Sequence, residues 1–140
     1  MKILSTLILL VVLFSCGRNN NAPIRQKSPE ELRQDLRTTE HQNFNQYLTV
    51  HSSNSADYKV WTDKYQIKGY IQNTASIARF KDAVLTVSFL TETDTELGSS
   101  DNPLYKFIEP NSKTEFVITT RMPSATKKFN VRIKAIVPID

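Results

Sequence analysis

The sequence predicts an all-β protein built as an antiparallel sandwich of about six or seven strands, preceded by one short helix. From residue 47 onward, apolar and polar residues alternate with a period of two in several stretches, and turn-forming residues separate these stretches. No helical pattern lies between them, which disfavours a parallel sheet because parallel strands need long crossover connections. A small β-barrel is the architectural alternative.

The composition fits one folded domain. The chain has 140 residues, of which 39% are hydrophobic and 23% are charged, values typical of globular proteins. Three glycines, one cysteine and two histidines argue against a glycine-rich phosphate loop, a disulfide framework and a Cys/His zinc site. The formal net charge is +4, whereas nucleic-acid-binding proteins concentrate more charge on one face, so we expect no nucleic-acid partner.

The N-terminal segment has the pattern of an export signal. Lys2 supplies a positive charge, and residues 3–13 form an apolar run interrupted only by Ser5 and Thr6. As a helix this run would be about 16 Å long, which is too short for the roughly 30 Å hydrocarbon core of a bilayer. It matches the apolar core of a signal peptide, so we expect residues 1–15 to be removed.

The end of this segment, Leu13-Phe14-Ser15-Cys16, resembles the lipobox of bacterial lipoproteins, which has leucine three positions before a cysteine and a small residue directly before it. Phe14 is bulkier than the usual residue at its position. The resemblance implies cleavage before Cys16 and attachment of a diacylglycerol to its thiol, the nucleophile of that reaction. Two or more acyl chains, such as palmitate, anchor a protein stably to a membrane. An ordinary secretory signal with an incidental cysteine is the alternative.

The residues after this cysteine bear on localisation. In the lipoprotein family that this segment resembles, an aspartate directly after the cysteine retains many members in the inner membrane, whereas this chain has Gly17 there. Residues 17–21 also lack the acidic residues of a surface-export signal. The resemblance therefore implies a place in the bacterial cell envelope, at the outer membrane and facing the periplasm. Residues 16–27 are polar and are expected to form a flexible tether between the lipid and a domain at residues 28–140.

A helix is predicted to begin at Ser28 and to end near residue 39 or 40. Ser28 can cap it, Pro29 suits its first position, and Glu31 completes a capping box. Leu32 and Leu36 form its apolar stripe, so one narrow edge should be buried against one end of the domain. A partner-binding helix is the alternative.

The strands are predicted from alternation and from turns. If Asp63-Lys64 formed a two-residue turn, Val60 would face Ile67 and the apolar faces of the two flanking strands would coincide. Residues 93–103 are predicted to be a polar loop, with further strands at 104–108 and 115–121. The clearest central strand has an unbroken row of inward-facing apolar residues, consisting of Ala83, Leu85, Val87 and Phe89. The last strand is predicted to have a second inward-facing row, consisting of Phe129, Val131, Ile133, Ala135 and Val137.

Four stretches occur in an order known from one family of domains: Gly69-Tyr70-Ile71-Gln72-Asn73, then residues 85–90, residues 108–116 and residues 129–133. The series is similar to the FxLYD-type immunoglobulin-like domains of bacterial envelope proteins, in which a G-x-V-x-N strand end precedes a V-x-V-x-F strand, an L-x-P-G-x turn and a closing strand. Asn111 replaces the usual glycine, although asparagine also tolerates a left-handed backbone. Thr91-Glu92 stands where Tyr-Asp is typical. Over residues 65–137 the resemblance implies an immunoglobulin-like sandwich outside the cytoplasm, with no catalytic residues and no cofactor.

Two sets of residues are candidate metal ligands. Glu92, Asp94 and Glu96 alternate, so on an extended strand their carboxylates would point the same way and could hold calcium. A solvated loop is the alternative. His41 and His51 could form a metal pair, but with no cysteine nearby they are expected to be solvated loop residues. We predict no metal site, with the three carboxylates as the calcium candidate.

Basic residues gather near the last strand. They could dock an anionic glycan, a lipid headgroup or an acidic partner, and the alternative is that they protect an edge strand from aggregation. The cluster consists of Lys127, Lys128, Arg132 and Lys134.

Trp61 is the only tryptophan. In the predicted hairpin its side chain points away from the apolar face, so it could stack on a sugar or anchor a protein partner. The alternative is that Leu32 and Leu36 of the predicted helix cover it.

These features predict a lipid-anchored, non-enzymatic module of the cell envelope that binds another envelope protein. A small module for glycan or calcium is the second hypothesis, and it rests on Trp61 or on the three carboxylates. An enzyme is the third, since a sandwich can host catalysis, but no residue set in the sequence requires it.

Overall fold

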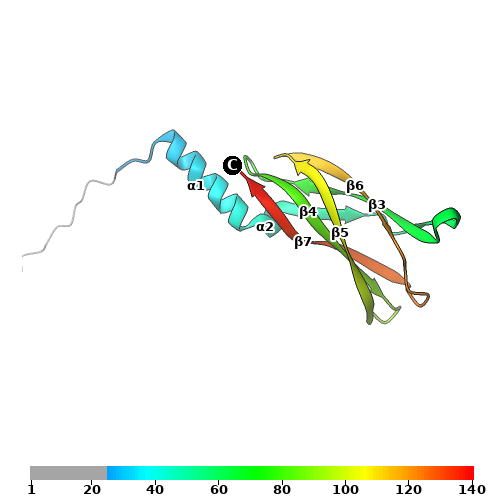
Figure 1. The fold of residues 1–140 in the computed structure, drawn as a ribbon. Coiled ribbons are helices and arrows are strands. Elements are labelled where there is room, and N and C mark those ends of the chain that lie inside the picture. The colour runs from blue at the N-terminus through cyan, green and yellow to red at the C-terminus, as the bar shows by residue number, and fades with distance from the viewer. Residues whose placement is uncertain (1–24) are drawn as a thin grey trace, which may run out of the picture.

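The computed structural model of the protein describes residues 25–140, whose helices and strands are shown in Figure 1. The predicted signal peptide at residues 1–15, the predicted lipidation of Cys16 and most of the predicted tether lie outside the described residues. In the described part, two helices precede seven strands. Neither of these helices is long and apolar enough to cross a membrane.

The first helix, α1, covers Pro29–Gln42 and begins as predicted. The Ser28 hydroxyl accepts a hydrogen bond from the backbone N–H of Glu31 at 3.2 Å, and the Glu31 carboxylate accepts one from the backbone N–H of Ser28 at 2.7 Å. The predicted capping box is therefore confirmed. Asn43 ends α1, and a second helix, α2 at Phe44–Tyr47, leads into the first strand.

The first sheet is organised around β3 (Lys64–Asn73). Along one edge of β3 lie β1 (Leu48–Ser52) and β2 (Asp57–Lys59), which pair with its two halves. Along the other edge lies β6 (Ser112–Thr120). All three pairings are antiparallel.

The second sheet has the order β5-β4-β7. Its central strand β4 (Arg79–Leu90) pairs antiparallel with β5 (Glu96–Ile108) and with β7 (Lys128–Ile139). The two sheets face each other, and α1 extends from one end of the sandwich (Figure 1). The predicted fold class, an antiparallel all-β sandwich after a short helix, is confirmed.

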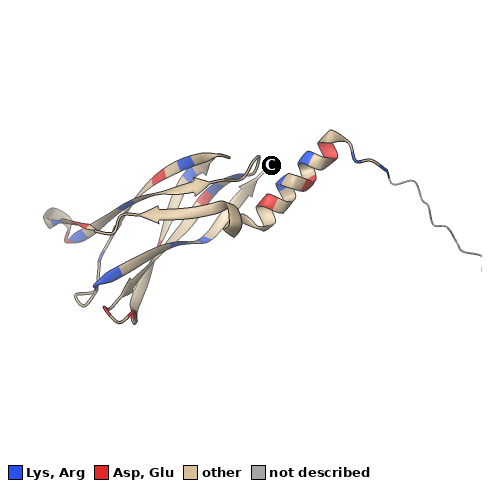
Figure 2. Cartoon of the chain, turned by 180° about the vertical axis from the view of Figure 1, so that it is seen from behind, with Lys and Arg blue, Asp and Glu red and all other residues tan. Residues whose placement is uncertain are grey.

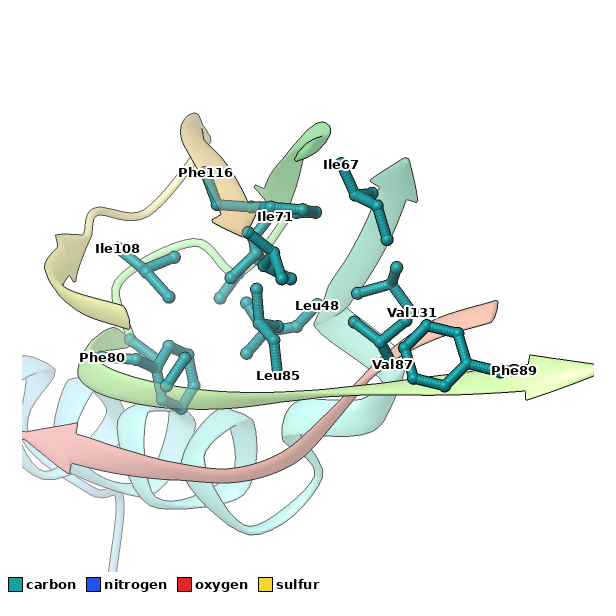
Figure 3. Close-up of a cluster of buried hydrophobic side chains, with 14 residues drawn as sticks. Leu48, Ile67, Ile71, Phe80, Leu85, Val87, Phe89, Ile108, Phe116 and Val131 are labelled. Atoms are coloured by element: carbon teal, nitrogen blue, oxygen red, sulfur yellow. The ribbon is translucent and has the colours of Figure 1, made fainter. Parts of the chain in front are cut away.

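The core fills the space between the two sheets. In Figure 3 the labelled side chains of both sheets point toward one another, Ile67 and Ile71 from β3 against Leu85 and Val87 from β4. This interior excludes water from apolar surface and supplies the main driving force for folding. The inward row predicted for the central strand is confirmed, because every member is buried: Ala83, Leu85, Val87 and Phe89.

The last strand departs from its predicted alternation. The register of β7 against β4 shifts between Ile133 and Ala135, so an extra residue enters β7 at this point. Beyond the shift Ala135 and Val137 are exposed, whereas Ile136 packs against the core. Their predicted inward orientation was wrong, because a bulge moves every later side chain to the other face and leaves no mark in the period-two pattern.

Most of the predicted polar loop at residues 93–103 is also strand. β5 begins at Glu96 and pairs with β4 through Ser99, Asp101 and Pro103, among others. Backbone hydrogen bonds to a central strand outweigh the weak strand propensity of serine and aspartate. Because β5 is an edge strand, it also tolerates a proline.

The hairpin between β2 and β3 has a longer loop than predicted. Tyr58 pairs with Tyr65, and the chain then forms a 3-10 turn, η1 (Val60–Thr62), followed by Asp63 in the left-handed region at φ 52°. A two-residue turn favours glycine or asparagine, which Asp63-Lys64 lacks. The predicted pairing of Val60 with Ile67 was therefore wrong, and Val60 lies in the loop.

Helix α1 docks through its last turn and not through its leucines. Leu32 and Leu36, predicted to be buried, are exposed. His41 instead places its ring edge-on against Phe80 of the core, with 5.4 Å between ring centroids. Figure 1 shows that the first turns of α1 extend beyond the sheets, which explains why the leucine stripe meets no partner.

Two buried polar side chains hold the turn between β3 and β4. Glu40 of α1 is 1% exposed, and its carboxylate accepts hydrogen bonds from the consecutive backbone N–H groups of Ser76, Ile77 and Ala78 at 2.7 to 3.0 Å. The amide of Asn73 donates to the carbonyl of Ala78 at 3.0 Å. Burial alone would raise the pKa of Glu40, but the three N–H donors outweigh it and lower the pKa below its usual value.

Candidate functional site

The structure does not assemble the predicted metal ligands. Within residues 25–140, no three His, Cys, Asp or Glu side chains gather to hold a metal ion. His41 belongs to α1 and contacts Phe80, while His51 belongs to β1 and stacks on Tyr70 with 4.7 Å between ring centroids. The predicted loop position was wrong for both histidines, because each lies in a regular element. His51 is exposed, as predicted, whereas His41 is half-buried.

The three carboxylates considered for calcium do not share an extended strand. Glu92 and Asp94 lie in the turn between β4 and β5, and only Glu96 belongs to a strand. Asp94 has a left-handed backbone at φ 62° and accepts a hydrogen bond from Lys128 at 2.9 Å. The geometric premise of the calcium candidate was therefore wrong.

The basic cluster is partly neutralised by ion pairs. Lys128 pairs with Asp94 at 2.9 Å and Lys134 pairs with Asp101 at 2.5 Å. Hydrogen bonds from Lys134 and then from Thr86 lower the pKa of Asp101. Basic and acidic residues are interspersed over the sheets (Figure 2). Of the predicted cluster of Lys127, Lys128, Arg132 and Lys134, two members are therefore paired with carboxylates, and none of the ion pairs within residues 25–140 includes the other two, Lys127 and Arg132.

An exposed group of apolar side chains lies on the outer face of the β5-β4-β7 sheet. Tyr105 is 79% exposed, Phe107 is 61% exposed and Val137 is 43% exposed. Phe107 of β5 and Val137 of β7 both pair with Lys81 of β4, so they flank it in one row across the sheet. We call Tyr105, Phe107 and Val137 the aromatic patch.

The rim of the aromatic patch is charged. The guanidinium of Arg79 lies 5.7 Å from the centroid of the Phe107 ring and forms hydrogen bonds of 2.6 and 2.7 Å with the Glu109 carboxylate. None of the ion pairs within residues 25–140 includes Lys81. The aromatic patch therefore combines exposed apolar surface with Lys81, which has no carboxylate partner within residues 25–140.

Sequence reasoning missed the aromatic patch for two reasons. In residues 104–108 both faces of the strand carry large apolar side chains, so alternation does not show which face is buried. Val137 was assigned to the core because the β7 bulge was not foreseen. A signal that could have helped is Pro103, since proline marks an edge strand.

Trp61 lies at the tip of the β2–β3 loop and is 99% exposed, and its neighbour Val60 is 75% exposed. Figure 1 places this loop at the end of the sandwich opposite α1. The alternative that Leu32 and Leu36 cover the indole was therefore wrong. Exposed tryptophan of this kind fits a contact residue and not a core residue.

The fluorescence of Trp61 tests this placement directly, because the chain has one tryptophan. We expect the folded protein to emit at the wavelength of a water-exposed indole, and acrylamide to quench it as strongly as it quenches the urea-unfolded chain. Quenching that increases clearly on unfolding would contradict the exposed position.

Comparisons with known proteins give no family for the chain. No protein-family model matches it, and no curated protein matches it. Its fold resembles the X-ray structure of a Northeast Structural Genomics Consortium target with a TM-score of 0.37 and 10% sequence identity, over 69% of this chain and 88% of that chain. A likeness at this level supports no statement about function.

Proposed function

We propose that the protein is a lipid-anchored, non-enzymatic module of the bacterial cell envelope that binds another envelope protein through the aromatic patch. The resemblance of Leu13-Phe14-Ser15-Cys16 to a lipobox supports the anchor on Cys16. The resemblance of residues 65–137 to FxLYD-type immunoglobulin-like domains supports an extracytoplasmic module. The residues after Cys16 support an outer-membrane location facing the periplasm.

The exposure of Tyr105 and Phe107 is the observation that carries this proposal. Two exposed aromatic side chains of the edge strand β5, with the exposed Val137 across Lys81 from Phe107, leave apolar surface that water solvates poorly. Aromatic side chains are also the residues that dominate protein–protein binding energy. Lys81 between Phe107 and Val137 favours a partner whose apolar surface carries a carboxylate opposite this lysine.

The lowered pKa values of the described carboxylates have structural causes. Catalytic groups tend to have pKa values shifted by an arrangement that serves the reaction. Here the lowered pKa values of Asp101 and Glu109 arise from hydrogen bonds to Lys134 and Arg79, and that of Glu40 arises from its contact with a turn. These partners give each shift a structural explanation.

The second candidate function is glycan binding, and the exposed indole of Trp61 favours it because aromatic faces stack on sugar rings. The two candidates differ in the residues that they require. Protein binding through the aromatic patch requires Tyr105 and Phe107, whereas glycan binding requires Trp61.

Site-specific photo-crosslinking in cells tests the proposed function. A photoreactive amino acid in place of Phe107 or Tyr105 should give a discrete adduct with a second protein. Val117 of β6 is a matched control, because it is 57% exposed and lies in the other sheet. We expect no adduct from that position.

Two further variants sharpen the crosslinking test. Lys81→Glu should weaken the adduct formed at position 107, because it places a negative charge opposite the expected carboxylate. Cys16→Ala should deplete the adduct if lipidation brings the two proteins together. Equal adduct yields at positions 107 and 117, or no adduct at 105 and 107, would contradict the proposal.

A further inference from the structure

We infer that the β2–β3 loop is a second membrane contact, in which Trp61 and Val60 insert into the headgroup region of an anionic lipid surface while Lys59 and Lys64 face its phosphates. This inference goes beyond the proposed function, because it concerns the opposite end of the sandwich from α1 and does not involve the aromatic patch. Only the order of the two contacts rests on the proposed lipid anchor.

The tip of the loop exposes apolar side chains. Trp61 is 99% exposed and Val60 is 75% exposed, so neither side chain is covered by any described part of the protein. A tryptophan carries a large apolar surface together with an N–H that needs a polar partner. The membrane interface satisfies both requirements, which is why tryptophan is enriched there.

The loop has a defined conformation. The hydroxyl of Tyr58 donates to the Asp63 carboxylate at 2.8 Å, and the rings of Tyr58 and Tyr65 lie 5.0 Å apart across the hairpin. Asp63 itself holds the left-handed backbone position that reverses the chain. These contacts present Trp61 outward from a fixed base, so less conformational freedom is lost when it binds.

Two positive charges lie opposite each other at the base of the loop. Lys59 and Lys64 are direct cross-strand partners in the β2–β3 ladder. Like charges directly opposite each other destabilise a strand pair. None of the ion pairs within residues 25–140 includes Lys59 or Lys64. The nearby Asp57 pairs with Lys68. An anionic surface would relieve this repulsion.

The combination of an apolar tip and two unmatched lysines favours a lipid surface over a protein pocket or a sugar. Lysines close to an anionic membrane gain electrostatic attraction while a neighbouring tryptophan enters the headgroup layer. From Cys16 to the start of α1 there are thirteen residues, which can span about 40 Å when extended. That reach lets the sandwich lie along the membrane that holds the lipid, with the loop as a second point of contact.

Vesicle binding tests this inference with Trp61 as its own reporter. The chain from residue 16 with Cys16→Ser retains every described residue and carries no lipid. On vesicles of phosphatidylethanolamine and phosphatidylglycerol we expect its emission to shift to shorter wavelength and to become protected from acrylamide. Vesicles of phosphatidylcholine alone should give a much smaller change, because they carry no net charge.

Variants test whether the loop is the part of the protein that binds the vesicles. Where the tryptophan is replaced, co-sedimentation with vesicles measures the binding in place of fluorescence. Trp61→Ala should weaken vesicle binding about tenfold or more. Lys59→Gln and Lys64→Gln should each weaken it about fivefold. Lys113→Gln is the matched control, since it removes an exposed lysine from the outer face of β6 and should leave vesicle binding unchanged.

Three outcomes would overturn the inference: unchanged emission on both kinds of vesicle, wild-type binding by Trp61→Ala, or an equal loss in Lys113→Gln. The result is separable from that of the crosslinking experiment. A Phe107→Ser variant should bind vesicles normally even where it loses its protein partner. A Trp61→Ala variant should keep the adduct at position 107.

Discussion

Replacing Gly69 by alanine should lower the free energy of unfolding by about 3 kcal/mol, at the upper end of the usual cost of forcing extra atoms into a packed interior. Domains of this size are stable by only about 5 to 15 kcal/mol. The change should therefore be plain in urea denaturation followed by circular dichroism at neutral pH.

The reason lies in the space around Gly69 in the middle of β3. A Cβ atom at this position would lie 2.3 Å from the carbonyl oxygen of His51 and 2.5 Å from Cζ of Phe116. The first neighbour is backbone of β1 and the second is a buried ring of β6, so neither moves freely. One methyl group would push against both edges of the first sheet at once.

Gly98 is the matched control for Gly69. It has no atom within 4 Å of its Cβ position, but its φ of +153° disfavours other residues. Gly98→Ala should therefore cost only backbone strain, about 1 kcal/mol at the lower end of such costs. Combining Gly69→Ala with Phe116→Leu should recover part of the loss beyond additivity, since it removes one of the two collisions.

A loss within about 0.5 kcal/mol for Gly69→Ala, the usual range for surface substitutions, would contradict the close approach of β1 and β6 to Gly69. A full recovery in the double variant would show that the His51 carbonyl is farther away than the structure places it.

The parts of the fold that depend on neighbouring residues could be predicted from the sequence. The capping box of α1 joins Ser28 to Glu31, three residues apart, and both hydrogen bonds are present. The inward row of β4 follows from strict alternation on a strand that is covered by the opposite sheet. In both cases the deciding interactions involve only residue type and short spacing.

The parts that depend on irregular backbone could not be predicted. The bulge in β7 turned Ala135 and Val137 outward, and the loop before Asp63 removed Val60 from the hairpin ladder. Each is a departure of one or a few residues from a regular pattern. Backbone hydrogen bonding and the left-handed turn residue decide such departures, and hydrophobic periodicity records neither.

The candidate sites also differ in how much of them could be predicted from the sequence. Trp61 could be singled out from the sequence as an exposed residue, although it lies in the loop at Val60–Thr62 and not on a strand face as predicted. The ion pairs that neutralise the basic cluster could not, because Lys134 and Asp101 are thirty-three residues apart and Lys128 and Asp94 are thirty-four apart. The docking of α1 through Glu40 was missed because a charged side chain is rarely fully buried.

Glu40→Gln should lower the free energy of unfolding by about 2 to 3 kcal/mol at pH 7, the usual contribution of hydrogen bonds to a charged group. The glutamine keeps the shape of the side chain, but its amide NH₂ faces backbone N–H groups of the turn that begins at Ser76, and a donor cannot accept from a donor. Urea denaturation at pH 7 measures the loss.

The effect of Glu40→Gln should depend on pH in a defined direction. Burial opposes the charge, but the three N–H donors outweigh it and hold the folded-state pKa of Glu40 below its unfolded value near 4.5. The ionised carboxylate therefore contributes its full stability above about pH 4.5, and this contribution is lost as the pH falls through the lower folded-state pKa. The difference in the free energy of unfolding between the natural chain and Glu40→Gln should therefore become smaller as the pH falls below about 4.5.

Glu109→Gln is the control for this titration. The pKa of Glu109 is also lowered, by its hydrogen bonds with Arg79, but its side chain is exposed and solvent weakens the pair. We expect Glu109→Gln to change stability much less than Glu40→Gln at pH 7. If the loss in Glu40→Gln were the same at pH 3 as at pH 7, it would come from the amide donor that faces the turn, and the charge of Glu40 would contribute nothing.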